Sequence, residues 1–211
     1  MKTVPQVELK SFTNDADTVV ANAAALCHGK ISSNPKGMIS HLLRRNHLSP
    51  FEHAVFQFDI KDISRACSHQ LVRYRIASPT QESQRHVEPN ISRCVIPPSI
   101  KTDEQKNIYK NATRRAFKTM RKLIELGVPL EDARYVLPNA TGTRIALTMN
   151  ARSLLNFFSQ RCCKTAQWEI RNVAFQMLKL VREVAPAIFS FVGAPCSFGG
   201  GCRENEPCAK D

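Results

Sequence analysis

The segment RYRIASPTQESQRH, residues 73–86, gathers arginines and uncharged polar side chains into one short span. Two arginines around a tyrosine open it, and Arg85 follows a link rich in serine, proline and glutamine. The planar guanidinium of arginine suits phosphates and carboxylates, and it stacks on flat rings. Within the link, SPTQ (residues 78–81) has the pattern of a capped helix start, whose free N–H groups attract anions. The segment therefore predicts an anion pocket, and a capped loop with solvated arginines is the alternative.

The spacing inside this segment resembles the signature of the flavin-dependent thymidylate synthases. That family carries an Arg-His-Arg triplet, a serine after seven further residues, and an arginine two positions later. Arg73, Arg75, Ser83 and Arg85 fall on the pattern, while Tyr74 stands in place of the histidine. The resemblance implies an enzyme that methylates dUMP with the help of a flavin.

Two more segments carry the same resemblance. HLSPFEH (residues 47–53) matches the family's HxTPFEH box, with Ser49 in place of threonine. NARSLLNFFSQR (residues 150–161), followed by AQWEI, matches a second family segment. Without the resemblance, the first segment would be a turn with solvated histidines, and Arg161 would cap a helix C-terminus through the macrodipole.

The resemblance implies roles for individual residues in two groups. The implied flavin contacts are His47, Ser49, Arg73, Tyr74, Arg75, Gln81, Asn150, Arg152 and Asn156. The implied nucleotide contacts are Gln70, Arg73, Gln81, Glu82, Ser83, Gln84, Arg85, Arg134 and Arg161. In the second group, Arg134 corresponds to an arginine that reaches the nucleotide of a neighbouring subunit.

Arg161 is the predicted catalytic residue. The ring carbon that accepts the methylene group needs electron density, and a guanidinium beside the uracil imide and carbonyl stabilises the enolate-like form. Cys162 and Cys163 follow so closely that a nucleophilic thiol is an alternative, although the flavin family needs no protein nucleophile. The implied reaction is reductive methylation of dUMP to dTMP. Methylenetetrahydrofolate would donate the carbon, and FAD reduced by NADPH would donate the hydride.

Several positions depart from the family pattern. Thr80 and Gln81 stand where asparagine and glutamate are usual, so Gln81 can hydrogen-bond a ribose or an imide but cannot accept a proton. Tyr74 keeps an aromatic plane and lacks the titratable group of histidine. His86 replaces a tyrosine. These departures bear on individual contacts rather than on the activity.

Composition restricts the class of protein. With 211 residues and 43% hydrophobic content, the chain suits one globular domain. It has no apolar run that could span a bilayer and no signal-peptide hydrophobic region near its start, so we expect a cytoplasmic protein. The net charge of +12 fits either nucleic acid or small anionic ligands. The alternative function is therefore a non-catalytic, basic nucleic-acid-binding protein, and the basic face of a helix at 103–126 is its best candidate surface.

Hydrophobic periodicity predicts both strands and helices. Strands are expected at 3–12, around Phe56–Ile60 and at 143–149. Helices are expected at 15–27, after the cap Asn34, at 63–72, at 103–126 with Gly127 as its stop, after the cap Asn150 and at 166–185. The expected buried stripes are Val19, Ala23, Leu26 and Cys27 on the first helix and Tyr109, Ala112, Ala116, Met120 and Leu123 on the helix at 103–126.

These elements predict an α+β fold, with a small, mainly antiparallel sheet and several flanking helices in a single domain. The catalytic domain is expected at residues 1–191 and a Cys/Gly-rich tail at 192–211. The resemblance, which spans roughly residues 40–180, implies a homotetramer with active sites at subunit interfaces.

The tail raises a separate hypothesis. Cys196, Cys202 and Cys208 are regularly spaced in a stretch too poor in apolar residues to fold by burial. Zinc could tether it, with Cys162 or Cys163 as the fourth ligand. The alternatives are a frayed tail of reduced thiols, and disulfides in an oxidising or hot cytoplasm.

Overall fold

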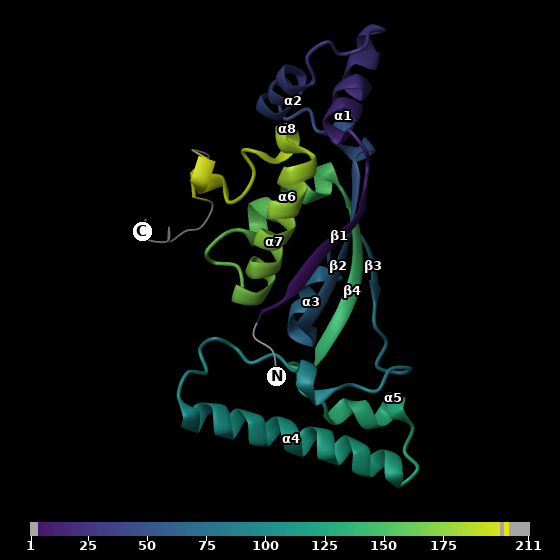
Figure 1. Cartoon of the computed structure of the whole chain (residues 1–211), viewed down its shortest axis with the longest axis vertical. Coiled ribbons are helices and arrows are strands. Elements are labelled where there is room, and N and C mark those ends of the chain that lie inside the picture. The colour runs from purple at the N-terminus through teal and green to yellow at the C-terminus, as the bar shows by residue number, and fades with distance from the viewer. Residues whose placement is uncertain (1–3, 199–200, 203–211) are drawn as a thin grey trace. The chain divides into compact units, whose positions relative to one another are not determined.

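A four-stranded sheet with the strand order β1-β2-β4-β3 forms the framework of the computed structural model (Figure 1). The structure describes residues 4–198 and 201–202. Its strands are β1 (Gln6–Phe12), β2 (Val55–Ser64), β3 (Ser78–Gln81) and β4 (Gly142–Asn150).

Backbone hydrogen bonds at the strand ends show that neighbouring strands run antiparallel. Thr13, just after β1, donates to the carbonyl of Val55 at the start of β2. Ala151, just after β4, donates to Ala54, just before β2. Glu82, just after β3, donates to Arg144 near the start of β4. In each pair, the end of one strand meets the start of the other, which is the antiparallel arrangement.

Helices make up most of the remaining described chain. They are α1 (Ala16–Ala25), α2 (Pro35–Arg44), α3 (Arg65–Leu71), α4 (Asp103–Glu125), α5 (Leu130–Ala133), α6 (Ala151–Arg161), α7 (Trp168–Val184) and α8 (Pro186–Phe189). Short 3-10 turns occur at Leu26–His28, Ser49–His53, Ile91–Arg93, Arg134–Val136 and Pro195–Phe198. Helices around a small antiparallel sheet confirm the predicted α+β class.

The chain forms two compact units. Of the described residues, unit 1 comprises 4–6, 60–73 and 80–145, and unit 2 comprises 7–59, 74–79, 146–198 and 201–202. Neither unit ends at residue 191, where the catalytic domain is expected to end and the tail to begin. That boundary stays a prediction.

The core of unit 2 is built around phenylalanines. Phe56 and Phe58 point to the buried face of β2, as the period-2 pattern predicts. Phe56 meets Phe189 edge to face, with ring centroids 5.5 Å apart, and Phe189 packs in the same way on Phe158 at 6.0 Å. Such edge-to-face pairs contribute beyond the area that they bury. Residues from β2, α6 and α8 thereby form one core.

The core of unit 1 lies under α4. Phe117 and Met120 are buried there with Cys94 and Ala133. Thr102 caps the helix in a complete capping box. Gly127 follows it with φ of 87°, a left-handed conformation that favours glycine. The predicted helix and its glycine stop are both confirmed.

Both predicted helix stripes are wrong in detail. On α1 the buried residues include Val20 and Ala25, while Leu26 is 73% exposed. The α-helix ends at Ala25, so the following 3-10 turn carries Leu26 away from the core. On α4 Phe117 is buried and Ala112 is exposed. The larger apolar side chain of Phe117 gains more from burial than the alanine does, and it sets the rotation of the helix.

The predicted helix start at SPTQ is also wrong, because residues 78–81 form the edge strand β3. Pro79 has no N–H to give to a sheet, and an edge strand is where a proline is tolerated. The anion pocket cannot rest on a helix N-terminus at this position.

One side chain of unit 2 joins residues far apart in sequence. The carboxylate of Asp17 on α1 accepts hydrogen bonds from the backbone N–H groups of Ala187 (2.8 Å) and Ile188 (3.1 Å). Aspartate therefore caps the short helix α8, which packs against both α1 and α2.

Candidate active site

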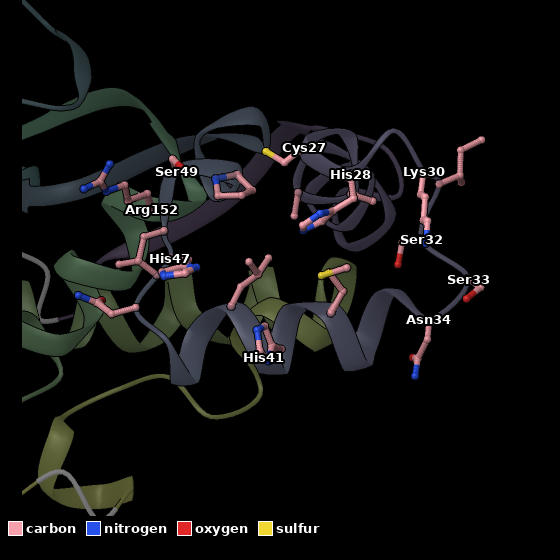
Figure 2. Close-up of a pocket in the computed structure, with 18 residues that line it drawn as sticks. Cys27, His28, Lys30, Ser32, Ser33, Asn34, His41, His47, Ser49 and Arg152 are labelled. Atoms are coloured by element: carbon pink, nitrogen blue, oxygen red, sulfur yellow. The ribbon is translucent and has the colours of Figure 1, made fainter.

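A pocket of about 970 Å³ in unit 2 holds part of the predicted flavin site. His47, Ser49 and Arg152 line one end, and Figure 2 shows Ser33 and Asn34 at the other. Ser49 opens the 3-10 turn before β2, and Arg152 lies in the first turn of α6. The pattern HLSPFEH thus brings His47 and Ser49, its two implied flavin contacts, to a cavity.

A second pocket of about 580 Å³ lies in the same unit. Tyr74, Arg75, Arg152 and Asn156 line it. The two pockets share Asn46 and Leu48 as well as Arg152, so they adjoin. Six of the nine predicted flavin contacts therefore lie around adjoining cavities: His47, Ser49, Tyr74, Arg75, Arg152 and Asn156.

The polar groups around these cavities suit a dinucleotide. Guanidiniums can bind a pyrophosphate, while amides and hydroxyls can bind ring and ribose oxygens. The Arg152 guanidinium is ion-paired with the carboxylate of Glu52, so an incoming phosphate would share that guanidinium with Glu52. Asn150 has a different use. Its Oδ1 accepts from the Ser153 N–H at 2.9 Å and caps α6, as predicted from sequence.

Arg161, the predicted catalytic residue, closes α6 and lines a third pocket of about 250 Å³. Its Nε is buried and has no hydrogen-bond partner among the residues that the structure describes. A buried donor without an acceptor costs about 1–3 kcal/mol, so the geometry favours a bound acceptor at this atom. The guanidinium also lies over the ring of Tyr74, with Cζ 5.7 Å from the ring centroid, within cation–π range.

Tyr74 is fixed by three contacts. Its ring packs edge to face on buried Phe157, with centroids 5.1 Å apart. Its hydroxyl donates to Gln160 Oε1 at 2.8 Å. Burial raises the pKa of Tyr74, and the charge of Arg161 and a hydrogen bond from it oppose this rise. The tyrosine that replaces the family histidine is therefore neutral and held against Arg161.

Cys162 does not fit the alternative of a nucleophilic thiol. It is buried behind the end of α6, and burial raises its pKa to about 12, although the charge of Arg182 acts against the rise. Only the thiolate is nucleophilic, so this side chain is inert near neutral pH. Cys163 is half-buried, and its sulfur lies 3.2 Å from the hydroxyl of Thr165.

Two predicted nucleotide contacts of unit 1, Gln81 and Glu82, are bound by neighbouring side chains. Gln81 Nε2 donates to Ser68 Oγ at 2.8 Å and Thr143 Oγ1 at 3.2 Å. Its side-chain N–H groups therefore point into the protein, and its Oε1 is left as the group for a ligand. Glu82 accepts two bonds from Arg93, at 2.8 and 3.1 Å. Both predicted side chains thus have structural partners.

Arg93 is held firmly in this network. Its Nε lies 3.6 Å from Asp62, a buried residue with a left-handed φ of 58°. The backbone of Arg93 also lies against Gly142, where an added Cβ would stand 2.1 Å from the Arg93 carbonyl oxygen. Glycine is required there for the start of β4 to approach this segment.

Arg85 and Arg134 both bind Glu131. Arg85 Nε lies 2.7 Å from the Glu131 carboxylate, and Arg134 Nε donates to the Glu131 carbonyl at 2.9 Å. The pKa of Arg65 is lowered, first by burial and then by the positive charge of Arg134. Two guanidiniums that repel each other would be stabilised by an anion between them.

Ser83, Gln84, Gln70 and Arg73 complete this group. Ser83 Oγ accepts from the Arg85 N–H at 3.2 Å in a local turn. Gln84 and Gln70 are partly exposed. Helix α3 ends at Leu71, so the expected helical face shared by Gln70 and Arg73 does not form. Arg73 itself is exposed.

Sequence reasoning missed several residues of these sites. Gln160 binds Tyr74, and Arg93 holds Glu82. Arg65 stands beside Arg134, and Asn34 was identified only as a helix cap. No motif marks them, because each depends on contacts made across the fold.

The cysteine hypothesis is tested only in part. Cys196 and Cys202 line the same 250 Å³ pocket as Cys163, but Cys208 lies outside the described residues. Across residues 4–198 and 201–202, no group of three or more His, Cys, Asp or Glu side chains is arranged to hold a metal. All seven cysteines in those ranges are free thiols.

A family model for the thymidylate synthase complementing protein matches residues 8–187. This chain belongs to that family. One relative is a flavin-dependent thymidylate synthase from Geobacter sulfurreducens. It is 42% identical over 219 residues, which cover 97% of this chain and 94% of that relative. Another, from Saccharolobus solfataricus, is 44% identical over 217 residues, which cover 95% of this chain and 81% of that relative.

A solved structure is similar over the same extent. The UMP/dUMP methylase PolB from Streptomyces cacaoi, crystallised with 5-Br dUMP, matches with a TM-score of 0.81 and 26% identity, covering 94% of this chain and 97% of that one. The family resemblance read from the motifs is thereby confirmed. Within the described ranges, no helix has the length and apolar character needed to cross a membrane.

Proposed function

We propose that this chain is a flavin-dependent thymidylate synthase that converts dUMP to dTMP. The single observation that carries the proposal is the setting of Arg161. Its Nε is a buried donor that finds no acceptor in the described part of the chain, and the ring of a neutral tyrosine lies against its guanidinium. A ligand carbonyl would satisfy that donor. Family membership supplies the identity of the ligand, because related proteins carry the name flavin-dependent thymidylate synthase and PolB is a UMP/dUMP methylase.

In this proposal Arg161 polarises the uracil ring. A guanidinium directed at the imide and carbonyl stabilises negative charge there, and electron density rises on the carbon that takes up the methylene group. No protein nucleophile is required, which agrees with the raised pKa of Cys162.

The finer assignments rest on the residues around each cavity. His47, Ser49, Arg75, Arg152 and Asn156 would hold FAD, which supplies hydride when a nicotinamide cofactor, assigned here as NADPH, has reduced it. Arg85 and Arg134 would bind the nucleotide phosphate, and Gln81 Oε1 would accept from its ribose or imide. Methylenetetrahydrofolate would donate the carbon.

We also infer a cytoplasmic homotetramer with active sites at subunit interfaces, on the basis of the family. Size-exclusion chromatography with light scattering tests the assembly. The structural zinc is a further prediction, and the described thiols alone do not supply its ligands. Metal analysis tests it: about one zinc per chain, lost in Cys202→Ser, would support a clip.

The basic face of α4 gives less support to the alternative of nucleic-acid binding. Arg121 lies 3.6 Å from Glu88, and Lys122 lies 3.2 Å from Glu125. Part of the charge is therefore balanced within the chain.

The decisive experiment uses the purified full chain. We expect yellow protein whose flavin absorption bleaches on addition of NADPH, and formation of dTMP from dUMP and methylenetetrahydrofolate. Colourless protein that takes up no added FAD, makes no dTMP and binds nucleic acid with a steep salt dependence would overturn the proposal.

A further inference from the structure

A chain of contacts connects Arg161 to Asn156 through Tyr74, assigned above only to the flavin, and Gln160, which has no assigned role. Tyr74 Oη donates to Gln160 Oε1 at 2.8 Å. Gln160 Nε2 donates to Asn156 Oδ1 at 3.2 Å. The Arg161 guanidinium lies over the Tyr74 ring, with Cζ 5.7 Å from the ring centroid, and its charge favours negative charge on the Tyr74 oxygen. All four residues belong to unit 2.

The hydrogen bonds between these side chains can run in only one direction. Arginine can donate hydrogen bonds but cannot accept them, and the hydroxyl of a neutral tyrosine has a single proton. The guanidinium beside Tyr74 cannot take the tyrosine proton, so that proton is available for Gln160. The Gln160 oxygen is thereby fixed toward Tyr74, and its NH₂ group toward Asn156. Asn156 consequently receives a bond on its oxygen and keeps its own NH₂ group for another acceptor.

The same residues separate two cavities. Tyr74 and Asn156 line the 580 Å³ pocket, while Gln160 and Arg161 line the 250 Å³ pocket. Tyr74 is anchored from behind by Phe157, which is completely buried. The bond network therefore joins a residue predicted to bind flavin to the residue predicted to act on uracil.

We propose that Tyr74 and Gln160 are positioning residues that couple these two sites. Tyr74 holds the Arg161 guanidinium in its working orientation, and Gln160 fixes the Asn156 amide so that its NH₂ group faces the 580 Å³ pocket. The inference rests on the proposed function, since it assigns both residues to that reaction.

The first test replaces Tyr74 in the holoenzyme. Tyr74→Phe keeps the ring and removes the hydroxyl, so we expect kcat for dTMP formation to fall roughly five- to tenfold. Flavin content and melting temperature should stay near those of the wild type. In an Arg161→Lys background the same change should add almost no further loss, because the hydroxyl acts through the arginine. Tyr135→Phe, at a residue that is 82% exposed, is the matched control.

Tyr74→His supplies a readout that a purely structural role would not move. A neutral imidazole can accept from Arg161 and donate to Gln160, so activity near pH 8 should approach that of the wild type. Protonation below about pH 6.5 turns both ring nitrogens into donors. The variant should therefore lose activity at low pH through a titration that the wild type lacks.

The second test changes the Asn156 end of the hydrogen-bond network and leaves its Arg161 end in place. Gln160→Glu keeps an acceptor for Tyr74 and places a carboxylate oxygen against Asn156 Oδ1, which forces the Asn156 amide to turn over. We expect a shifted flavin absorption spectrum and a several-fold lower affinity for FAD. Gln176 makes the same bond to Asn172 on α7, at 2.6 Å, so Gln176→Glu is the control and should leave both quantities unchanged.

The outcomes distinguish this inference from the proposed function. A wild-type protein that binds no flavin and makes no dTMP would overturn both. An active wild type whose Tyr74→Phe variant keeps kcat within twofold would overturn the positioning role alone. So would an additive loss in the Arg161→Lys background, or an unchanged flavin spectrum in Gln160→Glu.

Discussion

Arg161 in unit 2 and Arg85 in unit 1 are both predicted to act on the nucleotide, yet their neighbours differ in kind. Arg161 is held by an aromatic ring and a neutral hydroxyl, and no carboxylate pairs with it among the described residues. Arg85 is paired with the carboxylate of Glu131 at 2.7 Å. Neutral partners orient a guanidinium and leave its charge available, whereas a carboxylate partner balances that charge until an anion replaces it. The first setting suits stabilisation of charge that develops during a reaction, and the second suits reversible capture of a phosphate.

Removal of the unbalanced charge should have the largest effect. Arg161→Ala should lower the rate of dTMP formation by roughly two to three orders of magnitude, with flavin still bound, because the partner of Arg161 is the uracil. Single-turnover assays on the yellow variant measure this. Turnover near that of the wild type would refute the catalytic assignment.

The motif arginines offer the next test. Arg73→Ala with Arg75→Ala should give folded but colourless protein, because charge-assisted contacts to an anionic cofactor are among the stronger polar ones. The ratio of flavin absorbance to protein absorbance measures occupancy, and circular dichroism checks the fold. A fully yellow double variant would exclude these arginines from the flavin site.

A smaller effect is expected where a carboxylate already balances the charge. Glu131→Gln should lower KM for dUMP by about two- to fivefold, since the phosphate no longer competes for Arg85, while Arg85→Ala should raise KM. Because the pair is about half exposed, its loss should change stability by less than about 1 kcal/mol. If both variants changed KM for dUMP in the same direction and by the same factor, Arg85 would bind only Glu131 and not the phosphate.

The last effect concerns stability and not turnover, at the thiol behind Arg161. Because burial raises the pKa of Cys162 from 9.0 to about 12, the folded protein keeps a proton that the unfolded chain releases above pH 9. Stability should therefore decline as pH rises from 9 toward 12. Urea unfolding at pH 8 and pH 10.5 should show a shallower decline in Cys162→Ala than in the wild type. Cys196→Ala, at an exposed position, is the control and should match the wild type.

The sequence predicted those parts of the fold that depend on local chemistry. Asn34 with Pro35, Asn150 and Gly127 mark helix ends by side-chain caps or by backbone freedom, and each helix is found. The alternation at Phe56 and Phe58 specified β2 because period-2 burial is a property of the strand itself.

Failures occurred where tertiary contacts decide. SPTQ carries every local sign of a helix start, yet pairing with β4 at the sheet edge makes it a strand. Phe117 rather than Ala112 faces the core of unit 1 because the neighbours of α4 could not be known. The site shows the same limit. Motifs indicated Tyr74 and Arg161, but Gln160 became visible only when the fold placed it against Tyr74.

The Asp17 carboxylate also has a consequence for how the chain is made. Its two backbone donors, Ala187 and Ile188, follow it by 170 and 171 residues. A ribosome that adds about 5–20 residues per second needs roughly ten to thirty seconds to cover that distance. Until then α1 and α2 emerge without the helix that packs against them, and the surface that α8 covers stays open. Unit 2 can therefore close only late in translation, and the nascent chain needs protection from aggregation longest at its earliest-made helices.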